Sequence, residues 1–212
     1  ACFILESFPA LSFNSATSLK GAWSRCAKLR VFPLITNTSN VTNFESAWFS
    51  CESLSSFPLI DTSGGTNFTT CWAGCTNIIS PFPSIDTSKG TDFERSWQQC
   101  ELLTSFPALN FTSGTQFKNT WQHCYLLADF GANMFDSTGT LASNAFFRAF
   151  ENCSLTAQSI ENILTSLVTN GATGIELHIS GGNNAAYSTW SSAAQTALAT
   201  LQSRSWNVTY NT

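Results

Sequence analysis

Residues 66–90, TNFTTCWAGCTNIISPFPSIDTSKG, contain all the features of a unit that recurs along most of the chain. Its tryptophan belongs to a series spaced by 25, 24, 25 and 24 residues, and each member has a cysteine three positions later: Trp23, Trp48, Trp72, Trp97 and Trp121. An aliphatic residue follows the cysteine, and a phenylalanine, mostly in a Phe-Pro pair, follows at Phe32, Phe57, Phe82, Phe106 and Phe130. A period in the twenties with fixed apolar positions is typical of a solenoid, in which each coil buries its apolar face against its neighbours.

Within one unit, Phe68, Trp72 and Cys75 lie at i, i+4 and i+7, which predicts a short helix with one buried face. The threonine two residues before that phenylalanine is a candidate N-cap, and the pairs Thr42/Glu45 and Thr91/Glu94 have the spacing of a capping box. The Phe-Pro segment is expected to be extended, because proline disfavours a helical residue before it. We therefore predict an α/β solenoid of 24–25-residue coils.

The rhythm changes after Phe130, where a longer stretch leads to Phe150 in place of tryptophan before Cys153. We expect the array to terminate there, which divides the chain into a solenoid of about six coils over 1–153 and an α/β capping segment over 154–212. Apolar spacing in the cap predicts helices at 159–169 and 189–201 and strands at 175–179 and 206–210. Cys2 and Leu5 already occupy positions in the middle of a unit, so we expect the chain to be a fragment of a longer array.

Only 10% of the residues are charged, against about 25% in a typical soluble domain, and the net charge is -4. Nine scattered Lys and Arg residues do not form the basic stripe that nucleic acid requires, nor a polybasic patch for a membrane surface. No apolar run is long enough to span a bilayer, so we expect neither nucleic-acid binding nor membrane insertion.

Seven of the eight cysteines share one position of the repeat, and stacking would place them above one another in the interior: Cys2, Cys26, Cys51, Cys75, Cys100, Cys124 and Cys153. We interpret them as buried free thiols, since parallel side-chain directions suit disulfides poorly. Cys71 falls outside this series, which leaves open an accessible thiol or a tolerated variant of a small-residue position. No pair has the spacing of a metal site, and we expect no metal or cofactor.

Candidate catalytic groups are sparse. Neither His123 nor His178 stands in an arrangement of a known nucleophile motif. Asp61 and Asp86 share a ladder position and could be glycosidase acids or calcium ligands, but repetition of a turn-capping residue explains them more simply. We expect a protein that is not an enzyme.

The unit CxxLxxFPxLDTSxGTxFxxxWxxC resembles the repeat of the BspA-like leucine-rich-repeat surface proteins over about residues 1–153. This chain departs from that family in having tryptophan where phenylalanine is more common. Its C-terminal stretch from Leu155 to Val208 is similar to the cap that closes such arrays in tail-fibre and adhesin-like proteins of phages. The resemblance implies recognition at a cell surface without catalysis, hence an extracellular location on a cell or at the tip of a fibre.

Positions that vary between coils are expected to form the outer, binding surface. These positions give the candidate ligand-binding residues Gln98, Gln99, Gln122, His123, Tyr125 and Phe49, an amide-rich set that suits sugar hydroxyls or a loop of a surface protein. The leading hypothesis is an adhesin or receptor-binding tip whose partner is a glycan or protein of a target cell. One alternative is a structural spacer or a subunit of a homotrimeric fibre, with Phe49 and Ile79 as contacts; a remote one is an ice-binding surface made from a ladder that includes Thr62 and Thr87.

Overall fold

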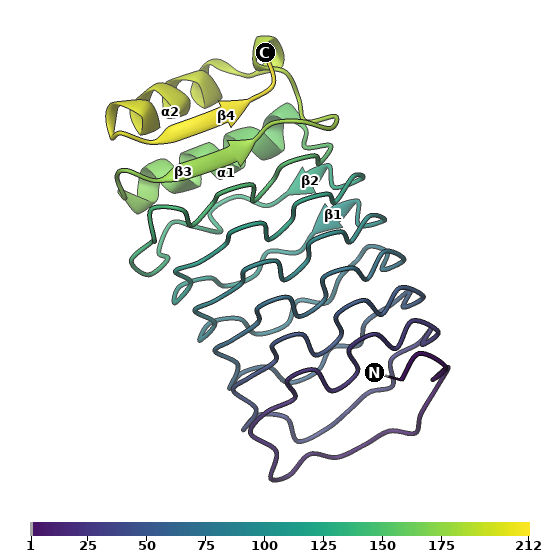
Figure 1. Cartoon of the computed structure of the whole chain (residues 1–212). Coiled ribbons are helices and arrows are strands. Elements are labelled where there is room, and N and C mark those ends of the chain that lie inside the picture. Colours follow the sequence, from purple (N-terminus) through teal and green to yellow (C-terminus); the bar gives the residue numbers. More distant parts are fainter. Residues whose placement is uncertain (1) are drawn as a thin grey trace.

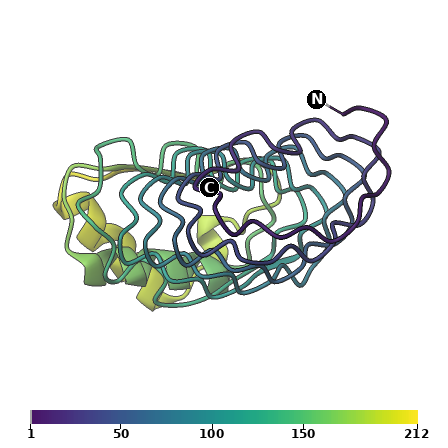
Figure 2. The ribbon, with the colours of Figure 1, turned by 90° about the horizontal axis from the view of Figure 1, so that it is seen from below.

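The structure is a computed structural model that describes residues 2–212. The chain winds into coils that lie one on top of another, with its two ends at opposite ends of the stack (Figure 1). The view from below shows the coils overlying one another, with the helices gathered on one side (Figure 2). Parallel bridges join equivalent residues of successive coils, namely Ser18, Asn43, Asn67, Asp92 and Gln116. The 24–25-residue period of the tryptophans is therefore also the period of the backbone contacts.

The stacked segments 18–26, 43–51, 67–75, 92–100 and 116–124, here called the turn ladder, consist of consecutive tight turns. In the second of them, the N–H groups of Phe44, Ser46 and Trp48 donate to carbonyls of the next coil, whereas the N–H of Ala47 donates to the carbonyl of Phe44. Ser46 and Ser50 have positive φ values of 55° and 52°. The short helices predicted from the i, i+4, i+7 spacing are wrong, because an α-helix would use these N–H groups internally and leave none for the neighbouring coil.

A side-chain oxygen at the start of these turn segments accepts a backbone hydrogen bond, but the pattern is not that of a capping box. The Oδ1 atom of Asn43 accepts a hydrogen bond from the N–H of Glu45 at 2.9 Å, and Asn67 and Asp92 do the same in the next two coils. The hydroxyl of Thr42 instead donates to the carbonyl of Thr17 at 3.3 Å. The predicted capping boxes at Thr42/Glu45 and Thr91/Glu94 are therefore wrong; the threonines join coils to one another.

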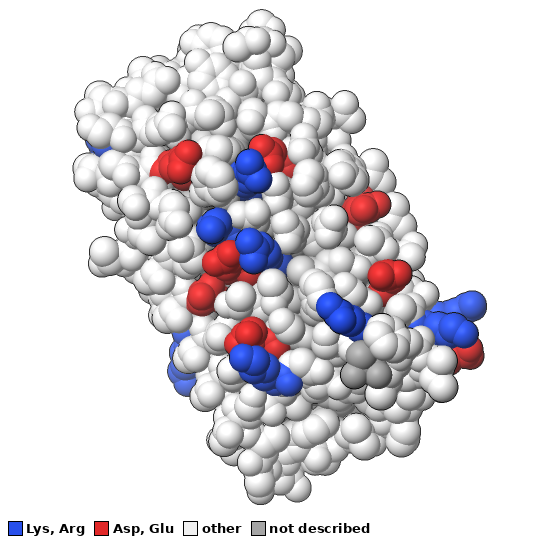
Figure 3. Space-filling view, viewed as in Figure 1, with Lys and Arg blue, Asp and Glu red and all other residues white. Residues whose placement is uncertain are grey.

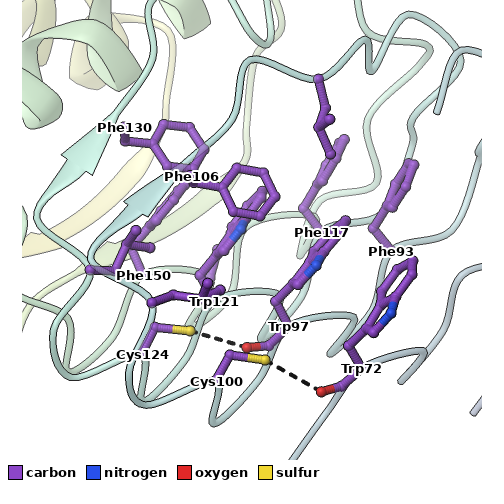
Figure 4. Packing of buried hydrophobic residues seen from close by; sticks show 14 of the residues in the cluster. Trp72, Phe93, Trp97, Cys100, Phe106, Phe117, Trp121, Cys124, Phe130 and Phe150 are labelled. Atoms are coloured by element: carbon purple, nitrogen blue, oxygen red, sulfur yellow. Dashed lines mark hydrogen bonds between the residues drawn. The ribbon is translucent and has the colours of Figure 1, made fainter. Parts of the chain in front are cut away.

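The interior contains aromatic ladders. Figure 4 shows the part of them from Trp72 to Phe150. Tryptophan rings of neighbouring coils are nearly parallel with centroids 5.2–6.1 Å apart, and Phe150 continues the series at 4.8 Å from Trp121. A second series joins Phe44, Phe68 and Phe93 at 5.3–5.4 Å. Each such pair contributes about 0.5–1.5 kcal/mol beyond the burial of its area. The repeated aromatic positions therefore set the alignment of the coils.

The cysteine series lies beside the tryptophans. All eight cysteines are free thiols, and five of them donate from Sγ to the carbonyl of a tryptophan in the preceding coil, at 3.0–3.3 Å. The prediction of buried, unbridged thiols is confirmed for six of the seven positions. Cys2 is exposed, contrary to the prediction. Cys71 is fully buried, so the alternative of an accessible thiol is wrong.

The Phe-Pro segments are extended, as predicted. Strands β1 (Ser105–Phe106) and β2 (Asp129–Phe130) pair in parallel, with Phe106 opposite Phe130, and Val31 bridges to Ser56 in earlier coils. Each coil thus has the turn ladder on one side and an extended arm on the other.

The C-terminal part contains α1 (Ala157–Asn170), β3 (Glu176–Ile179), a 3-10 turn at Tyr187–Thr189, α2 (Ser192–Ser203) and β4 (Asn207–Tyr210). These elements match the predicted helices and strands. The β3 strand bridges to the stack through Phe146 and Leu177, and β4 pairs in parallel with β3. The β3 and β4 strands of the predicted capping segment add two further parallel rungs to the stack.

Local sequence explains the helices. Thr156 caps the Ser159 N–H, and Gly171, with φ 82°, ends α1 in the left-handed conformation that glycine adopts readily. Ser191 caps α2 through the N–H of Ala194. Ile163 and Leu167 of α1 belong to the same buried cluster as the aromatic ladders, so the core is continuous across the 153/154 boundary.

Candidate functional site

The outward side of the turn ladder presents one set of equivalent side chains per coil. In segment 92–100, the other residues are half-buried or exposed, whereas four are buried: Phe93, Ser96, Trp97 and Cys100. Two left-handed residues per coil, four apart, produce this alternation; in this segment they are Arg95 and Gln99, with φ 57° and 60°. The backbone therefore holds a regular polar surface whose chemistry differs from coil to coil.

Gln98 and Gln122, two of the predicted ligand-binding residues, meet on adjacent coils. The Nε2 atom of Gln98 donates to Oε1 of Gln122 at 2.7 Å. Gln122 also accepts from Nδ2 of Asn119 at 2.8 Å and donates to Oε2 of Glu151 at 2.6 Å. Gln122 is only 4% exposed, so it positions its neighbours, and Gln98 presents the accessible amide.

His123 and Tyr125 also lie together, with ring centroids 5.6 Å apart. Nδ1 of His123 is 3.3 Å from Nδ2 of Asn152, and Tyr125 is 45% exposed. Gln99 is exposed, and its N–H donates to the carbonyl of Gln122 at 2.9 Å. These residues form the edge of the surface where the turn ladder passes into the following arm.

Phe49 is separate from these residues. It lies two coils before Gln98, is half-buried, and has the guanidinium of Arg25 at 5.8 Å from its ring centroid. The equivalent positions of the intervening third coil are Ala73, which is buried, and Gly74. The structure therefore joins five of the six predicted residues into one surface and places Phe49 outside it.

Five charged side chains and one phenylalanine ring form a continuous set that borders Gln98 and Gln122 and that was not among the predicted site residues. We call it the polar cluster; its members are Glu94, Arg95, Lys118, Phe147, Arg148 and Glu151. Figure 3 shows Lys, Arg, Asp and Glu atoms gathered near the middle of the face seen in Figure 1. Of its ion pairs, Arg95 and Glu94 are 3.3 Å apart, Lys118 and Glu94 4.0 Å, and Arg148 and Glu151 3.7 Å.

An aromatic ring connects the cationic members of the polar cluster. The guanidinium of Arg148 lies 5.1 Å from the ring centroid of Phe147, and Nζ of Lys118 lies 6.0 Å from it. His178 of β3 packs against the same ring at 4.7 Å and is 3.0 Å from Glu176. Cation–π contacts of this kind hold flexible cationic side chains in place.

Asn119 lies at the centre of this region with an unsatisfied atom. The N–H of Arg95 donates to the carbonyl of Lys118, and the N–H of Asn119 donates to the carbonyl of Phe147, so Asn119 occupies the rung between Arg95 and Arg148. The residue is 7% exposed, and its Oδ1 atom has no hydrogen-bond partner in the described chain. A buried acceptor without a donor costs free energy and is rare in folded proteins.

Alignment of the repeat positions was the signal that could have revealed part of the polar cluster. Glu94, Arg95 and Lys118 occupy outward positions of the same coils as the predicted glutamines. The period did not predict the positions of Phe147 and Arg148, because the sixth coil is longer. The N–H of Phe117 donates to the carbonyl of Ala145, which is 28 residues further on.

The two aspartates considered as acids or calcium ligands accept hydrogen bonds from the backbone. Asp61 and Asp86 accept hydrogen bonds from the N–H groups of Ser63 and Ser88 at 3.0 and 2.9 Å, which confirms turn capping. Hydrogen bonds from the Ser88 side chain and backbone hold the pKa of Asp86 below its usual range.

The ice-binding alternative requires Thr62 and Thr87 to expose their hydroxyl groups, and they do not. Thr62 and Thr87 are 1% and 0% exposed, and their hydroxyls donate to carbonyls of the next coil at 2.6 and 2.5 Å. They cannot form part of a flat ice-binding surface, because their hydroxyl groups lie inside the stack.

Within residues 2–212, no group of three or more His, Cys, Asp or Glu side chains is placed to hold a metal ion. None of the helices in that range is long and apolar enough to cross a membrane. Comparisons with protein-family models, with curated proteins and with solved structures gave no match.

Proposed function

We propose that the chain is a recognition module of the leucine-rich-repeat solenoid kind that binds a glycan or protein on the surface of a target cell, without catalysis. The observation that carries the proposal is the contrast between the two sides of the turn ladder. Inward positions repeat as tryptophan, phenylalanine and cysteine, whereas outward positions change from coil to coil on the same backbone. A fixed scaffold with variable surface residues suits a binding function.

The contact region of this proposal consists of Gln98, Gln99, His123 and Tyr125 with the adjoining polar cluster. Its amides and ring edges offer both donors and acceptors to a hydroxylated ligand, and Tyr125 provides an exposed aromatic face. An adhesin or the receptor-binding tip of a fibre would use such a surface outside the cell.

A binding panel tests this proposal. The labelled chain would be applied to a glycan array and to whole cells of diverse types, together with Gln98→Ala and Tyr125→Ala. Leu34→Ala is the matched control, because Leu34 is 53% exposed but follows a Phe-Pro pair on the opposite arm. We expect the two site variants to lose binding that the control retains; equal binding by all three would refute the assignment of the surface.

A second candidate function rests on exposed apolar residues. Ile79, Leu102 and Leu126 are 52%, 38% and 48% exposed, and Ile79 and Leu102 line a common depression with Arg30. Such a patch suits the contact between subunits of a homotrimeric fibre or spacer. Light scattering tests it: a trimer that Ile79→Ser converts to monomers would favour this function, whereas a monomer at all concentrations would exclude it.

A further inference from the structure

The charges of the polar cluster are unequally exposed. Arg95 and Arg148 have 44% and 50% of their side-chain surface exposed, whereas Glu94 and Glu151 have 25% and 24%. With Lys118, three cations face two carboxylates. A ligand that approaches the turn ladder here therefore meets the cationic groups first.

These cations also retain hydrogen-bonding capacity. Their separations from the carboxylates are 3.3–4.0 Å, longer than the 2.7–2.9 Å of a close charge-assisted hydrogen bond. Arginine presents its N–H donors as a planar fork that matches a carboxylate. The two guanidiniums come from equivalent positions of coils on either side of Asn119.

The neighbouring groups are suited to hydroxyls. Gln98 presents a half-buried amide beside the cluster, and Asn119 has an Oδ1 acceptor without a partner. A sugar hydroxyl that donates to Asn119 would satisfy this buried acceptor once the side chains that cover it move aside. Carboxylate and hydroxyls on one small ring are the chemistry of a sugar acid.

We infer that the polar cluster binds the carboxylate of an acidic saccharide between Arg95 and Arg148, with the adjacent sugar hydroxyls on Asn119 and Gln98. The inference rests on the proposed function and names the ligand class of that surface. Coulomb attraction and charge-assisted hydrogen bonds supply the selectivity for an acid, and the amides supply the selectivity for a sugar. Binding is therefore expected to weaken as salt screens the exposed charges.

The test uses three probes that separate these contributions: a short oligogalacturonate, its methyl ester, and an oligoglutamate peptide. The ester keeps the ring hydroxyls and removes the charge, whereas the peptide keeps the charge without the ring. Isothermal titration with the full chain should show oligogalacturonate bound at least about tenfold more tightly than either other probe, a factor that corresponds to ~1.4 kcal/mol.

Matched variants locate the site. Arg148→Asn and Arg95→Asn remove the charge and keep a residue that tolerates positive φ, which both positions require at 53° and 57°. Arg25→Asn is the control, because Arg25 also has positive φ and also lies over a phenylalanine ring, but on the first coil. Each site variant should bind oligogalacturonate about tenfold more weakly, the control should bind as the parent does, and all should melt at similar temperatures.

Three results would overturn the inference: equal affinity for the acid and the ester, equal or tighter binding of oligoglutamate, or equal losses in the control and the site variants. Absence of oligogalacturonate binding would also overturn it. The cell panel separates this failure from that of the proposed function, since cells bound through Gln98 and Tyr125 would leave the function standing without an acidic ligand.

Discussion

The turn ladder and the C-terminal units both join successive rungs through backbone hydrogen bonds, but the units differ in length. In both, the backbone of one rung donates hydrogen bonds to the next, and a buried cluster fills the interior. The bridges between Asn43, Asn67 and Asp92 join residues 24 and 25 apart, whereas Phe146, Leu177 and Val208 follow one another at intervals of 31.

The longer units place helices α1 and α2 where the shorter ones have an extended Phe-Pro arm. A 14-residue helix such as α1 cannot fit the return path of a 24-residue coil, which also has to close two corners. Unit length therefore selects the form of the arm, while the rung hydrogen bonds are common to both regions.

Trp72→Ala should have the largest effect, because it removes a fully buried ring that stacks on Trp48 at 5.4 Å and on Trp97 at 5.2 Å. We expect a loss of about 3–5 kcal/mol in the free energy of unfolding. Urea denaturation measures it. An unchanged midpoint would show that the short coils do not depend on the aromatic ladder, and Leu59→Ala, at an exposed position, should change the free energy by less than about 0.5 kcal/mol.

Ser166→Ala tests how α1 is attached to the preceding coil. The Ser166 Oγ accepts from the N–H of Phe135 at 2.8 Å and donates to Asp136 at 2.5 Å. Removal leaves a buried N–H without a partner, at a cost of about 1–3 kcal/mol. Thr165→Ala on the exposed side of the same helix is the control. Equal effects of the two variants would contradict a specific anchor at Ser166.

Alkaline pH should weaken the short coils through their thiols. Burial, opposed by a backbone hydrogen bond, raises the pKa of Cys124 to about 12 from 9.0. The folded pKa is above the unfolded one, so the contribution to stability is complete below pH 9 and is lost as pH rises from 9 toward 12.

The expected slope is about 1.4 kcal/mol per pH unit for each such thiol in this window. Burial also raises the pKa values of Cys75, Cys100 and Cys153 well above 9.0. Denaturation of the parent and of Cys124→Ala between pH 8 and pH 10.5 measures one thiol by difference. Identical slopes would mean that Cys124 ionises as readily folded as unfolded, against its burial.

Part of the molecule followed directly from the sequence. The tryptophan and cysteine intervals predicted the register of the coils, and the spacing of Ile160, Ile163, Leu164 and Leu167 predicted α1, because burial on one side imposes a period on the chain wherever it is repeated. Asp61 and Asp86 were assigned correctly as turn caps, since an aspartate two residues before an N–H acts locally.

The polar surface could be predicted only in part, because contacts between coils depend on the length of each coil. Gln98 and Gln122 were found as equivalent positions of one repeat, but their partner Glu151 lies beyond the 28-residue step that the period did not contain.

The period of the apolar residues predicted most of the inward-facing positions and how often they return, because burial against a neighbouring coil requires an apolar side chain at the same point of each unit. Contacts between coils, which the sequence does not reveal, make residues Phe68 to Cys75 form turns and not a helix, because their N–H groups donate to carbonyls of another coil. The same contacts bury Gln122 and leave Arg95 and Arg148 partly exposed, because the side chains that cover Gln122 come from neighbouring coils.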